Sequence, residues 1–173
     1  AGLAKAAVAF SVNGEQRDLS DVVIQDANIS IFTIDSDEGL EIMRHTVAAQ
    51  VLALAIKNLY PKAQLAIGPT IENGFYYDFL SDERVSIDDL PKIEKEMERI
   101  VAEKSVITKT IHLKKEAIKI FADTNEDYKV KIIEESEQED NFQLYNQGDT
   151  GFTDLCRGPH LPSTDKLKAF KLT

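Results

Sequence analysis

Residues 35–61 read DSDEGLEIMRHTVAAQVLALAIKNLYP and predict one long helix. Asp35 suits the N-cap position, and Glu38 three residues later would complete a capping box at the positive end of the helix dipole. Pro61 cannot continue a helix, so we expect the helix to end at Tyr60. Its alanine-rich middle lets other backbone approach closely, and we expect burial on several sides. The apolar positions at helical spacing are Leu40, Met43, Val47, Val51, Leu54 and Leu59.

The residues before this helix predict a small β-sheet. Apolar side chains alternate from Val8 to Val12, and Asn13-Gly14 is a preferred dipeptide for the tight turn of a hairpin. A further strand is expected around Ile31. Residues 1–35 contain too few apolar side chains for an independent core. We therefore interpret this segment as the end of a small β-rich domain whose beginning is missing.

The residues after the long helix alternate between strand and helix patterns. We expect a hairpin over 66–79, a helix capped at 86–89 with Pro91 near its start, a strand over 106–113, a helix over 114–122, a strand over 129–133, a solvated turn over 134–140 and a last strand around Phe170. This order predicts an α+β fold in which an antiparallel sheet packs on the long central helix. We expect two domains, a truncated one over residues 1–35 and a second over 36–173.

The composition excludes several classes of protein. Of the 173 residues, 43% are hydrophobic and 29% are charged, which excludes wholesale disorder. The formal net charge of −10 excludes nucleic-acid binding through phosphate contacts alone, because such binding requires an excess of Lys and Arg. No apolar run reaches the roughly 20 residues that span a bilayer, and the single cysteine, Cys156, allows no internal disulfide. We read no signal peptide and expect a soluble, cytoplasmic protein without membrane contact.

Cys156 and His160 are the residue pair that most directly suggests chemistry. The sequence Cys-Arg-Gly-Pro-His places a thiol and an imidazole four residues apart across a Gly-Pro turn, which can direct both side chains into one pocket. Three interpretations follow from the residues alone. The pair can bind zinc, act as a nucleophile with its base, or be a small buried hydrophobe beside a capped turn.

Four further polar residues do not identify a function individually. His45 lies early in the long helix, where a histidine is more often hydrogen-bonded or exposed than a ligand. His112 is expected on the exposed face of a strand. Lys129 lies in a half-buried expected strand, where a lysine usually extends to water but beside a pocket can orient water or stabilise an oxyanion. Asp154 is expected to cap the adjoining turn.

Four motifs occur together in a fixed order: GLEIMRH at 39–45, AIGPTIENGFYYDF at 66–79, YKV at 128–130 and DLCRGPH at 154–160. In order and spacing they resemble the N-terminal editing region of bacterial threonyl-tRNA synthetases, which is shared in outline with alanyl-tRNA synthetase editing domains. The resemblance covers almost all of residues 36–173 and implies the editing-domain fold. Residues 1–35 resemble the second half of the preceding ubiquitin-like (TGS) domain, a truncated β-grasp. Nothing resembles the class II aminoacylation core, so we expect no charging of tRNA.

The resemblance implies a hydrolase that cleaves the ester of mischarged seryl-tRNA(Thr). A site built for threonine gains only about 1–3 kcal/mol against serine from one methyl group, so a second, hydrolytic site is needed. An aminoacyl ester is already activated, so positioned water and oxyanion donors suffice. The implied partners are the 3′ acceptor end of tRNA(Thr) carrying serine and the remainder of the synthetase polypeptide.

The family motifs that follow the long helix match this sequence residue by residue. Cys156 and His160 match the second motif, and Asp154 matches its nearby acid. Lys129 matches a lysine implicated in water activation. The block that lines the pocket in the family contributes Gly74, Tyr76 and Tyr77.

The first motif, in contrast, departs from the family, which has two histidines four residues apart on the long helix. Counted from the upstream motif, His45 occupies the first position and Ala49 the second. Counted back from the end of the helix, Thr46 and Gln50 occupy the two positions. We expect one extra residue in this helix, accommodated as a π-bulge, a feature that is frequent at functional sites.

This departure bears on metal binding. Two histidines on the long helix, together with Cys156 and His160, would complete the four-ligand shell of a zinc ion. With one helix histidine the shell has three ligands and an open position, and with no helix histidine only Cys156 and His160 remain. We therefore expect no structural metal and a water positioned by polar side chains, with no cofactor. Two alternatives stay open: a zinc-dependent editing hydrolase of the alanyl type using Cys156 and His160, and a catalytically impaired module that binds the tRNA acceptor end or packs on the synthetase body.

Overall fold

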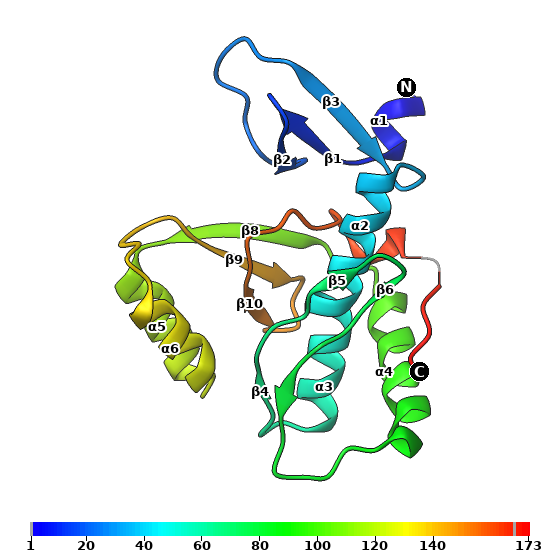
Figure 1. The fold of residues 1–173 in the computed structure, drawn as a ribbon, viewed down its shortest axis with the longest axis vertical. Helices are drawn as coiled ribbons and strands as arrows, with labels where there is room; N and C mark the ends of the chain where they lie inside the picture. Colours follow the sequence, from blue (N-terminus) through cyan, green and yellow to red (C-terminus); the bar gives the residue numbers. More distant parts are fainter. Residues whose placement is uncertain (1, 168) are drawn as a thin grey trace.

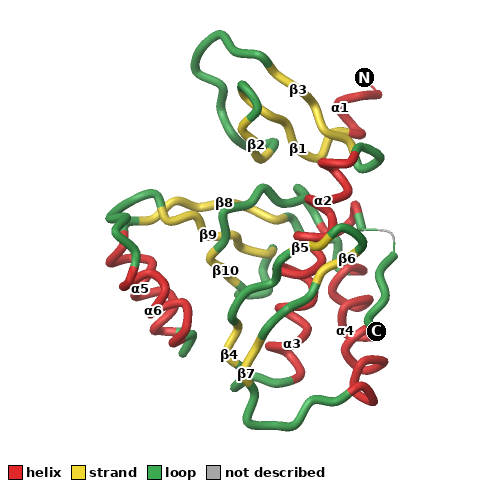
Figure 2. The backbone as a smooth tube through the Cα atoms, viewed as in Figure 1, coloured by secondary structure: helices red, strands yellow, loops and turns green. Residues whose placement is uncertain are grey.

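The computed structural model describes residues 2–167 and 169–173. A long helix runs through the molecule, with a small sheet at its N-terminal end and a second sheet beside it (Figure 1). Two further helices lie at the outer end of that second sheet (Figure 2). Every strand pair among the described residues is antiparallel, which confirms the α+β class. The editing-domain fold, the truncated β-grasp and the division at residue 35 remain predictions.

The long helix contains a π-helical segment, as we predicted from the one extra residue in its sequence. Its consecutive parts are α2 (Asp37–Thr46), the π-helix η1 (Val47–Leu52) and α3 (Ala53–Leu59). The N-cap is Ser36, whose Oγ accepts the Gly39 N–H at 3.1 Å. The prediction of Asp35 as the cap was therefore wrong by one residue, because the serine hydroxyl is the group that reaches the free amide.

The long helix forms the core, as predicted. All six residues of η1 are buried, and α4 (Leu90–Ala102) packs beside it through Ile93, Met97 and Ile100. By length and composition alone, the described residues contain one helix, Asp37–Leu59, that could cross a bilayer, but 72% of its most apolar window is buried inside the protein. That burial is typical of the core helix of a globular domain.

The N-terminal sheet has the predicted hairpin. Its strands, in the order β2-β1-β3, are β1 (Ala7–Val12), β2 (Glu15–Asp18) and β3 (Ile29–Thr33). Asn13 and Gly14 both have positive φ, 51° and 88°, as the turn requires. The short helix α1 (Gly2–Ala6) was not predicted, and β1 is buried on both faces rather than alternately.

Two nested strand pairs form the predicted hairpin over 66–79. The outer pair is β4 (Gln64–Leu65) with β7 (Phe79–Leu80), and the inner pair is β5 (Thr70–Ile71) with β6 (Gly74–Phe75). The predicted cap of the next helix is also confirmed. Ser86 and Asp89 form a capping box at the 3₁₀ turn η2 (Ile87–Asp89), which leads directly into α4.

The second sheet has the order β10-β9-β8 and is flanked by two helices. Its elements are β8 (Ile107–His112), α5 (Lys114–Asp123), α6 (Asp127–Glu135), β9 (Phe142–Gln147) and β10 (Thr153–Leu155). The prediction of a strand over 129–133 was wrong, because these residues belong to α6. Lys129 and Ile133, four residues apart, are the buried positions of that helix, so the pattern has the helical period as well as the alternating one.

The predicted last strand around Phe170 was also wrong. Beyond the 3₁₀ turn η3 (Thr164–Lys166), residues 169–173 have no regular structure. Phe170 and Leu172 pack against the core cluster around the long helix, and the Leu172 N–H donates to Glu94 of α4 at 2.6 Å. The segment is thus held by a helix instead of a neighbouring strand.

Candidate active site

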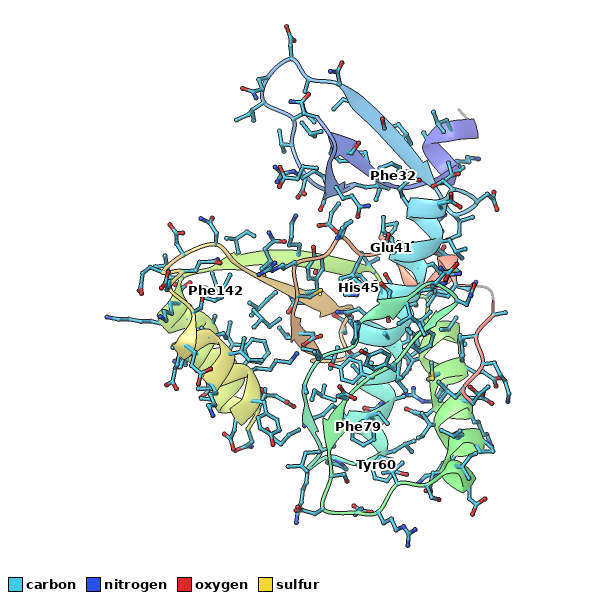
Figure 3. All side chains as sticks on the ribbon, in the orientation of Figure 1. Phe32, Glu41, His45, Tyr60, Phe79 and Phe142 are labelled. Carbon is cyan, nitrogen blue, oxygen red and sulfur yellow. The ribbon has the colours of Figure 1, made fainter. Side chains whose placement is uncertain are left out.

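Three side chains with metal-ligating or catalytic chemistry converge from distant parts of the sequence. His45 lies on α2, one helical turn after Glu41 (Figure 3). Cys156 and His160 lie in the loop that follows β10. One nitrogen or sulfur atom from each of the three lies within 4.8 Å of the others. The predicted convergence of these motifs is therefore present in the structure.

The thiol of Cys156 is hydrogen-bonded and neutral. Its sulfur lies 2.8 Å from His45 Nε2 and accepts the Gly158 N–H at 3.2 Å. Burial raises the pKa of the thiol to about 12, and burial also lowers the pKa of His45. A neutral thiol donates its hydrogen to the unprotonated Nε2 of a neutral imidazole. Cys156 is thus arranged as a hydrogen-bonding group and not as a thiolate nucleophile.

His160 has one ring nitrogen fixed by Thr46 and the other free. The Thr46 hydroxyl donates to Ile42 O at 2.8 Å and accepts the Leu161 N–H at 3.0 Å. Since the one hydroxyl hydrogen is used, the 3.1 Å contact to His160 Nδ1 requires a hydrogen on that nitrogen. The other nitrogen, Nε2, is an unprotonated acceptor that is buried and has no partner among the described residues.

His160 is held as a neutral base. The residue is 2% exposed, and its ring stacks on His45 with the ring centres 4.6 Å apart and the planes 8° apart. Burial, followed by the neighbouring His45, holds the pKa of His160 well below its ordinary value. The two imidazoles therefore remain neutral near pH 7, which gives the site acceptor capacity without positive charge.

The π-helix explains how both counting registers apply in part. His45 from one register contacts Cys156, and the adjacent Thr46 from the other contacts His160. Gln50 is completely buried further along, where the Gln147 side-chain amide donates to its backbone oxygen at 3.2 Å. Gln50 was predicted to bind substrate. In the structure its side-chain oxygen lies 3.5 Å from the Gln147 amide and forms no hydrogen bond with Cys156 or His160.

Lys129 and Asp154 form a buried ion pair beside the cluster. Lys129 Nζ lies 2.8 Å from Asp154 Oδ1 and donates to Ala66 O at 2.9 Å. Both side chains are almost fully buried, with exposed fractions of 5% and 4%. The two charges act on Cys156 in opposite directions, since Asp154 raises and Lys129 lowers the pKa of the thiol. The pair joins α6, β10 and the loop after β4 behind the site.

The three pocket residues predicted from the hairpin differ in position. Tyr77 is packed against Gly68, where a Cβ would lie 2.2 Å from the tyrosine ring. Burial, with Asp154 next, raises the pKa of its phenol, and its hydroxyl has no partner among the described residues. Tyr76 is 50% exposed, and Gly74 pairs with Ile71 in the inner hairpin. Tyr77 is therefore the member of the three that electrostatics links to the cluster.

A cavity of about 250 Å³ opens onto this cluster. Its lining comes from β2, α2, β5 and the loop after β10: Gln16, Glu41, Ile42, His45, Thr70, Cys156, Arg157, Gly158 and Pro159. His160, Lys129 and Asp154 are buried and are not among the lining residues. Sequence reasoning missed Gln16, Glu41, Thr70 and Arg157 as lining residues, although Arg157 lies within the quoted Cys-Arg-Gly-Pro-His motif.

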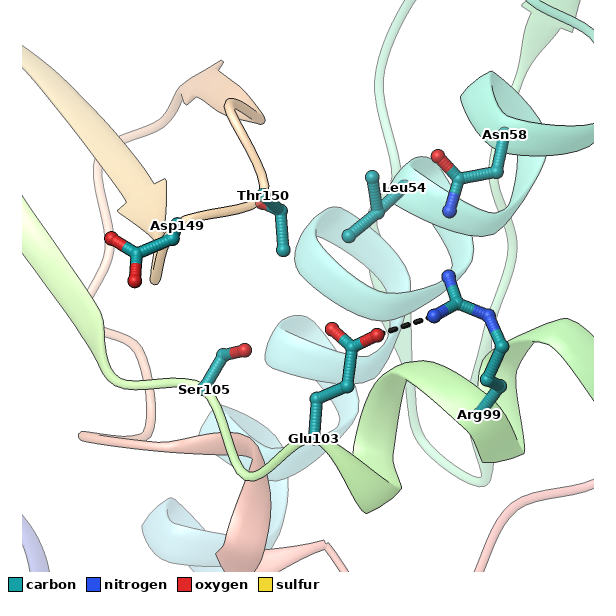
Figure 4. A pocket seen from close by; sticks show the side chains of 7 residues that line it. All are labelled: Leu54, Asn58, Arg99, Glu103, Ser105, Asp149 and Thr150. Carbon is teal, nitrogen blue, oxygen red and sulfur yellow. Dashed lines mark hydrogen bonds and ion pairs between the residues drawn. The ribbon is translucent and has the colours of Figure 1, made fainter.

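A larger hollow of about 450 Å³ lies beside α3 and α4 (Figure 4). Its polar lining includes Arg99, which pairs with Glu103, and Glu96 also binds the same guanidinium. The lining residues of the described chain include no histidine or cysteine. The chemistry of the molecule is thus concentrated at the smaller cavity.

Comparison with known proteins agrees with the motifs. Residues 142–173 match the family "Threonyl and Alanyl tRNA synthetase second additional domain". The chain is 47% identical over 173 residues to a threonine–tRNA ligase of Marinobacter nauticus, covering 100% of this chain and 26% of the relative. It is 49% identical over 171 residues to that of Clostridioides difficile, covering 99% and 26%.

The chain therefore spans about a quarter of the length of the curated relatives it matches. The similarity extends across both segments of the sequence, including the N-terminal sheet as well as the cluster of His45, Cys156 and His160. The resemblance seen in the motifs is confirmed: over its whole length this chain is similar to part of bacterial threonine–tRNA ligases, and its last 32 residues match a domain of threonyl and alanyl tRNA synthetases.

Proposed function

We propose that this chain hydrolyses the ester bond of seryl-tRNA(Thr), with the tRNA 3′ end entering the cavity beside His45. The observation that carries the proposal is the free Nε2 of His160, a buried neutral acceptor on a ring that stacks against His45 of the cavity lining. A buried polar atom without a protein partner is a position where a water binds. The tRNA acceptor end and the remainder of a synthetase are the proposed partners, in the cytoplasm.

In this mechanism His160 Nε2 accepts a proton from the attacking water. The water oxygen bonds to the ester carbonyl carbon, the bond to the ribose oxygen breaks, and the ribose oxygen receives the proton. Thr46 keeps the Nδ1 hydrogen in place, so the lone pair remains on Nε2. A correctly oriented base of this kind contributes about 10²–10⁴-fold to rate. Because His160 is 2% exposed, we expect the substrate carbonyl to stay in the cavity and the smaller water molecule to lie between the carbonyl and Nε2.

The lining of the cavity offers groups for the charged parts of the substrate. Arg157 suits a phosphate of the tRNA end, and the Glu41 carboxylate suits the ammonium of the amino acid. A chain with a net charge of −10 needs such a local cation to receive a polyanion. Lys129, with two of its three N–H groups used by Asp154 and Ala66, retains one for a water or an oxyanion.

The test is release of serine from seryl-tRNA(Thr) by the chain, with threonyl-tRNA(Thr) as the matched control. We expect serine release well above the uncatalysed rate and slower release of threonine. Release no faster than the uncatalysed rate would contradict the proposal. Binding of the tRNA end without turnover, unchanged in Cys156→Ala and Lys129→Ala variants, would instead identify a catalytically impaired binding module.

The zinc-dependent alternative is favoured by one observation, the compact set of His45, Cys156 and His160. Two imidazoles and a thiolate are ligands that zinc prefers, and three ligands leave an open position. Bound zinc would supply an activated water. The residues fit such an ion chemically, and elemental analysis of chain purified without chelator distinguishes the two mechanisms. Stoichiometric zinc together with loss of hydrolysis on chelation would select the metal-dependent one.

A further inference from the structure

Asp18 carries a contact between the N-terminal sheet and the candidate site. It is the last residue of β2, which ends beside the loop that follows β10 (Figure 1). Its Oδ1 accepts the backbone N–H of His160 at 3.0 Å. Its Oδ2 accepts the Tyr145 hydroxyl at 2.7 Å and lies 2.9 Å from Lys109 Nζ. One carboxylate, on a side chain that is 11% exposed, thus binds donors from β8, β9 and the loop after β10.

These contacts fix the turn that presents His160. The Tyr145 ring meets the His160 ring edge-on, with the ring centres 4.5 Å apart and the planes at 80°. Gly158 lies so close to Tyr145 that an added Cβ would be 1.8 Å from its hydroxyl. The imidazole therefore lies between His45 on one side and Tyr145 on the other, while Asp18 holds both Tyr145 and the His160 backbone.

We propose that Asp18 is a positioning residue for His160, so that the N-terminal sheet completes the hydrolytic site. The proposal rests on the proposed function and identifies a residue that acts through His160 without touching the substrate. Charge-assisted hydrogen bonds from buried donors to a carboxylate are strong and directional. Losing them frees the turn, and a misplacement of about 1 Å at a reacting group lowers the rate about 100-fold.

The experiment compares Asp18→Ala with Asp21→Ala in the full chain. Asp21 is the control because it pairs with the same Lys109 at 2.5 Å and accepts the Asp18 N–H at 3.2 Å, but it forms no hydrogen bond with His160 or Tyr145. Three quantities are measured: the single-turnover rate of serine release, the dissociation constant for seryl-tRNA(Thr), and the ring ¹⁵N resonances of His160. With three histidines in the chain, these resonances are readily assigned.

We expect Asp18→Ala to lower the rate about 10- to 100-fold, leave tRNA binding nearly unchanged and shift the His160 resonances. Asp21→Ala should do none of these. Asp18→Asn should restore part of the rate, because its amide oxygen can still accept the His160 N–H, and it replaces Asp18→Ala if that variant does not fold. If the wild-type chain releases no serine, the proposed hydrolytic function fails. The His160 resonances then decide by themselves whether Asp18 positions His160. Unshifted His160 resonances in Asp18→Ala would overturn it.

Discussion

Replacing Lys129 by Met tests whether the buried ion pair behind the site is structural as well as catalytic. The substitution keeps most of the side-chain volume and removes the ammonium. Asp154 then remains 3% exposed, with its carboxylate lacking the cation 2.8 Å away and retaining the N–H of Leu155. An ionised carboxylate left in such surroundings is costly, because its lost hydration is no longer compensated.

The magnitude follows from the burial of both partners. Breaking a fully buried pair by removing one member typically costs about 3–5 kcal/mol of unfolding free energy. Removing the remaining charge as well, in Lys129→Met/Asp154→Asn, should restore most of this loss, since an amide is cheaper to bury than an anion. The double variant therefore separates the stability contribution of the pair from the contribution of the ammonium to catalysis.

Urea unfolding followed by circular dichroism measures the free energies, and single-turnover deacylation measures the rates. We expect the double variant to regain stability while its hydrolysis stays slow, with the rate reduced more than the affinity for seryl-tRNA(Thr). A loss of under about 1 kcal/mol in Lys129→Met would refute the argument from burial. Recovery of both stability and rate in the double variant would refute the assigned role of the ammonium.

Three further predictions concern the cluster itself. Thr46→Val should cost about 2–4 kcal/mol of unfolding free energy, measured by urea titration, because it leaves the N–H of Leu161 and the Nδ1–H of His160 buried without an acceptor; Thr46→Ser, which keeps the hydroxyl, should cost far less. Burial lowers the pKa of His160 below 6.5, so on acidification the unfolded chain binds a proton that the folded chain does not. The contribution of this group to the unfolding free energy should therefore be complete above about pH 6.5 and should fall below it by up to about 1.4 kcal/mol per pH unit. An unfolding free energy that rises on acidification from about pH 6.5 would contradict this. Because the pKa of Cys156 is raised to about 12, its alkylation by iodoacetamide at pH 8 should be roughly 100-fold or more slower than that of a free cysteine, and labelling at the free-cysteine rate would show an exposed thiolate.

Local signals predicted much of the fold. The start of the long helix was predicted to within one residue, and the proline after it and the Asn13-Gly14 turn also act over a few residues, so a short window of sequence contains their cause. The strand predicted over 129–133 failed for a different reason. Its Lys-Val-Lys-Ile alternation is compatible with α6 once Lys129 finds a buried partner in Asp154, 25 positions further along the chain. Tertiary pairing decided between two periods that the segment satisfied equally.

The candidate site was predicted in its members more than in its geometry. The two counting registers named both His45 and Thr46, and the π-helix brings both to the cluster. No local pattern could have indicated Asp18, because its contact with His160 joins residues 142 positions apart and depends on how the N-terminal sheet meets the loop after β10. The neutral state of both imidazoles likewise follows from burial, which spacing does not encode.

The most direct test of the account compares wild-type chain with His160→Asn in single-turnover release of serine from seryl-tRNA(Thr). Asparagine keeps an N–H donor near the position of Nδ1 for Thr46 and removes the lone pair of Nε2. We predict rapid release by the wild type and a loss of about 10²–10⁴-fold in the folded variant. Equal rates in the two proteins would contradict the claim that His160 Nε2 activates the attacking water.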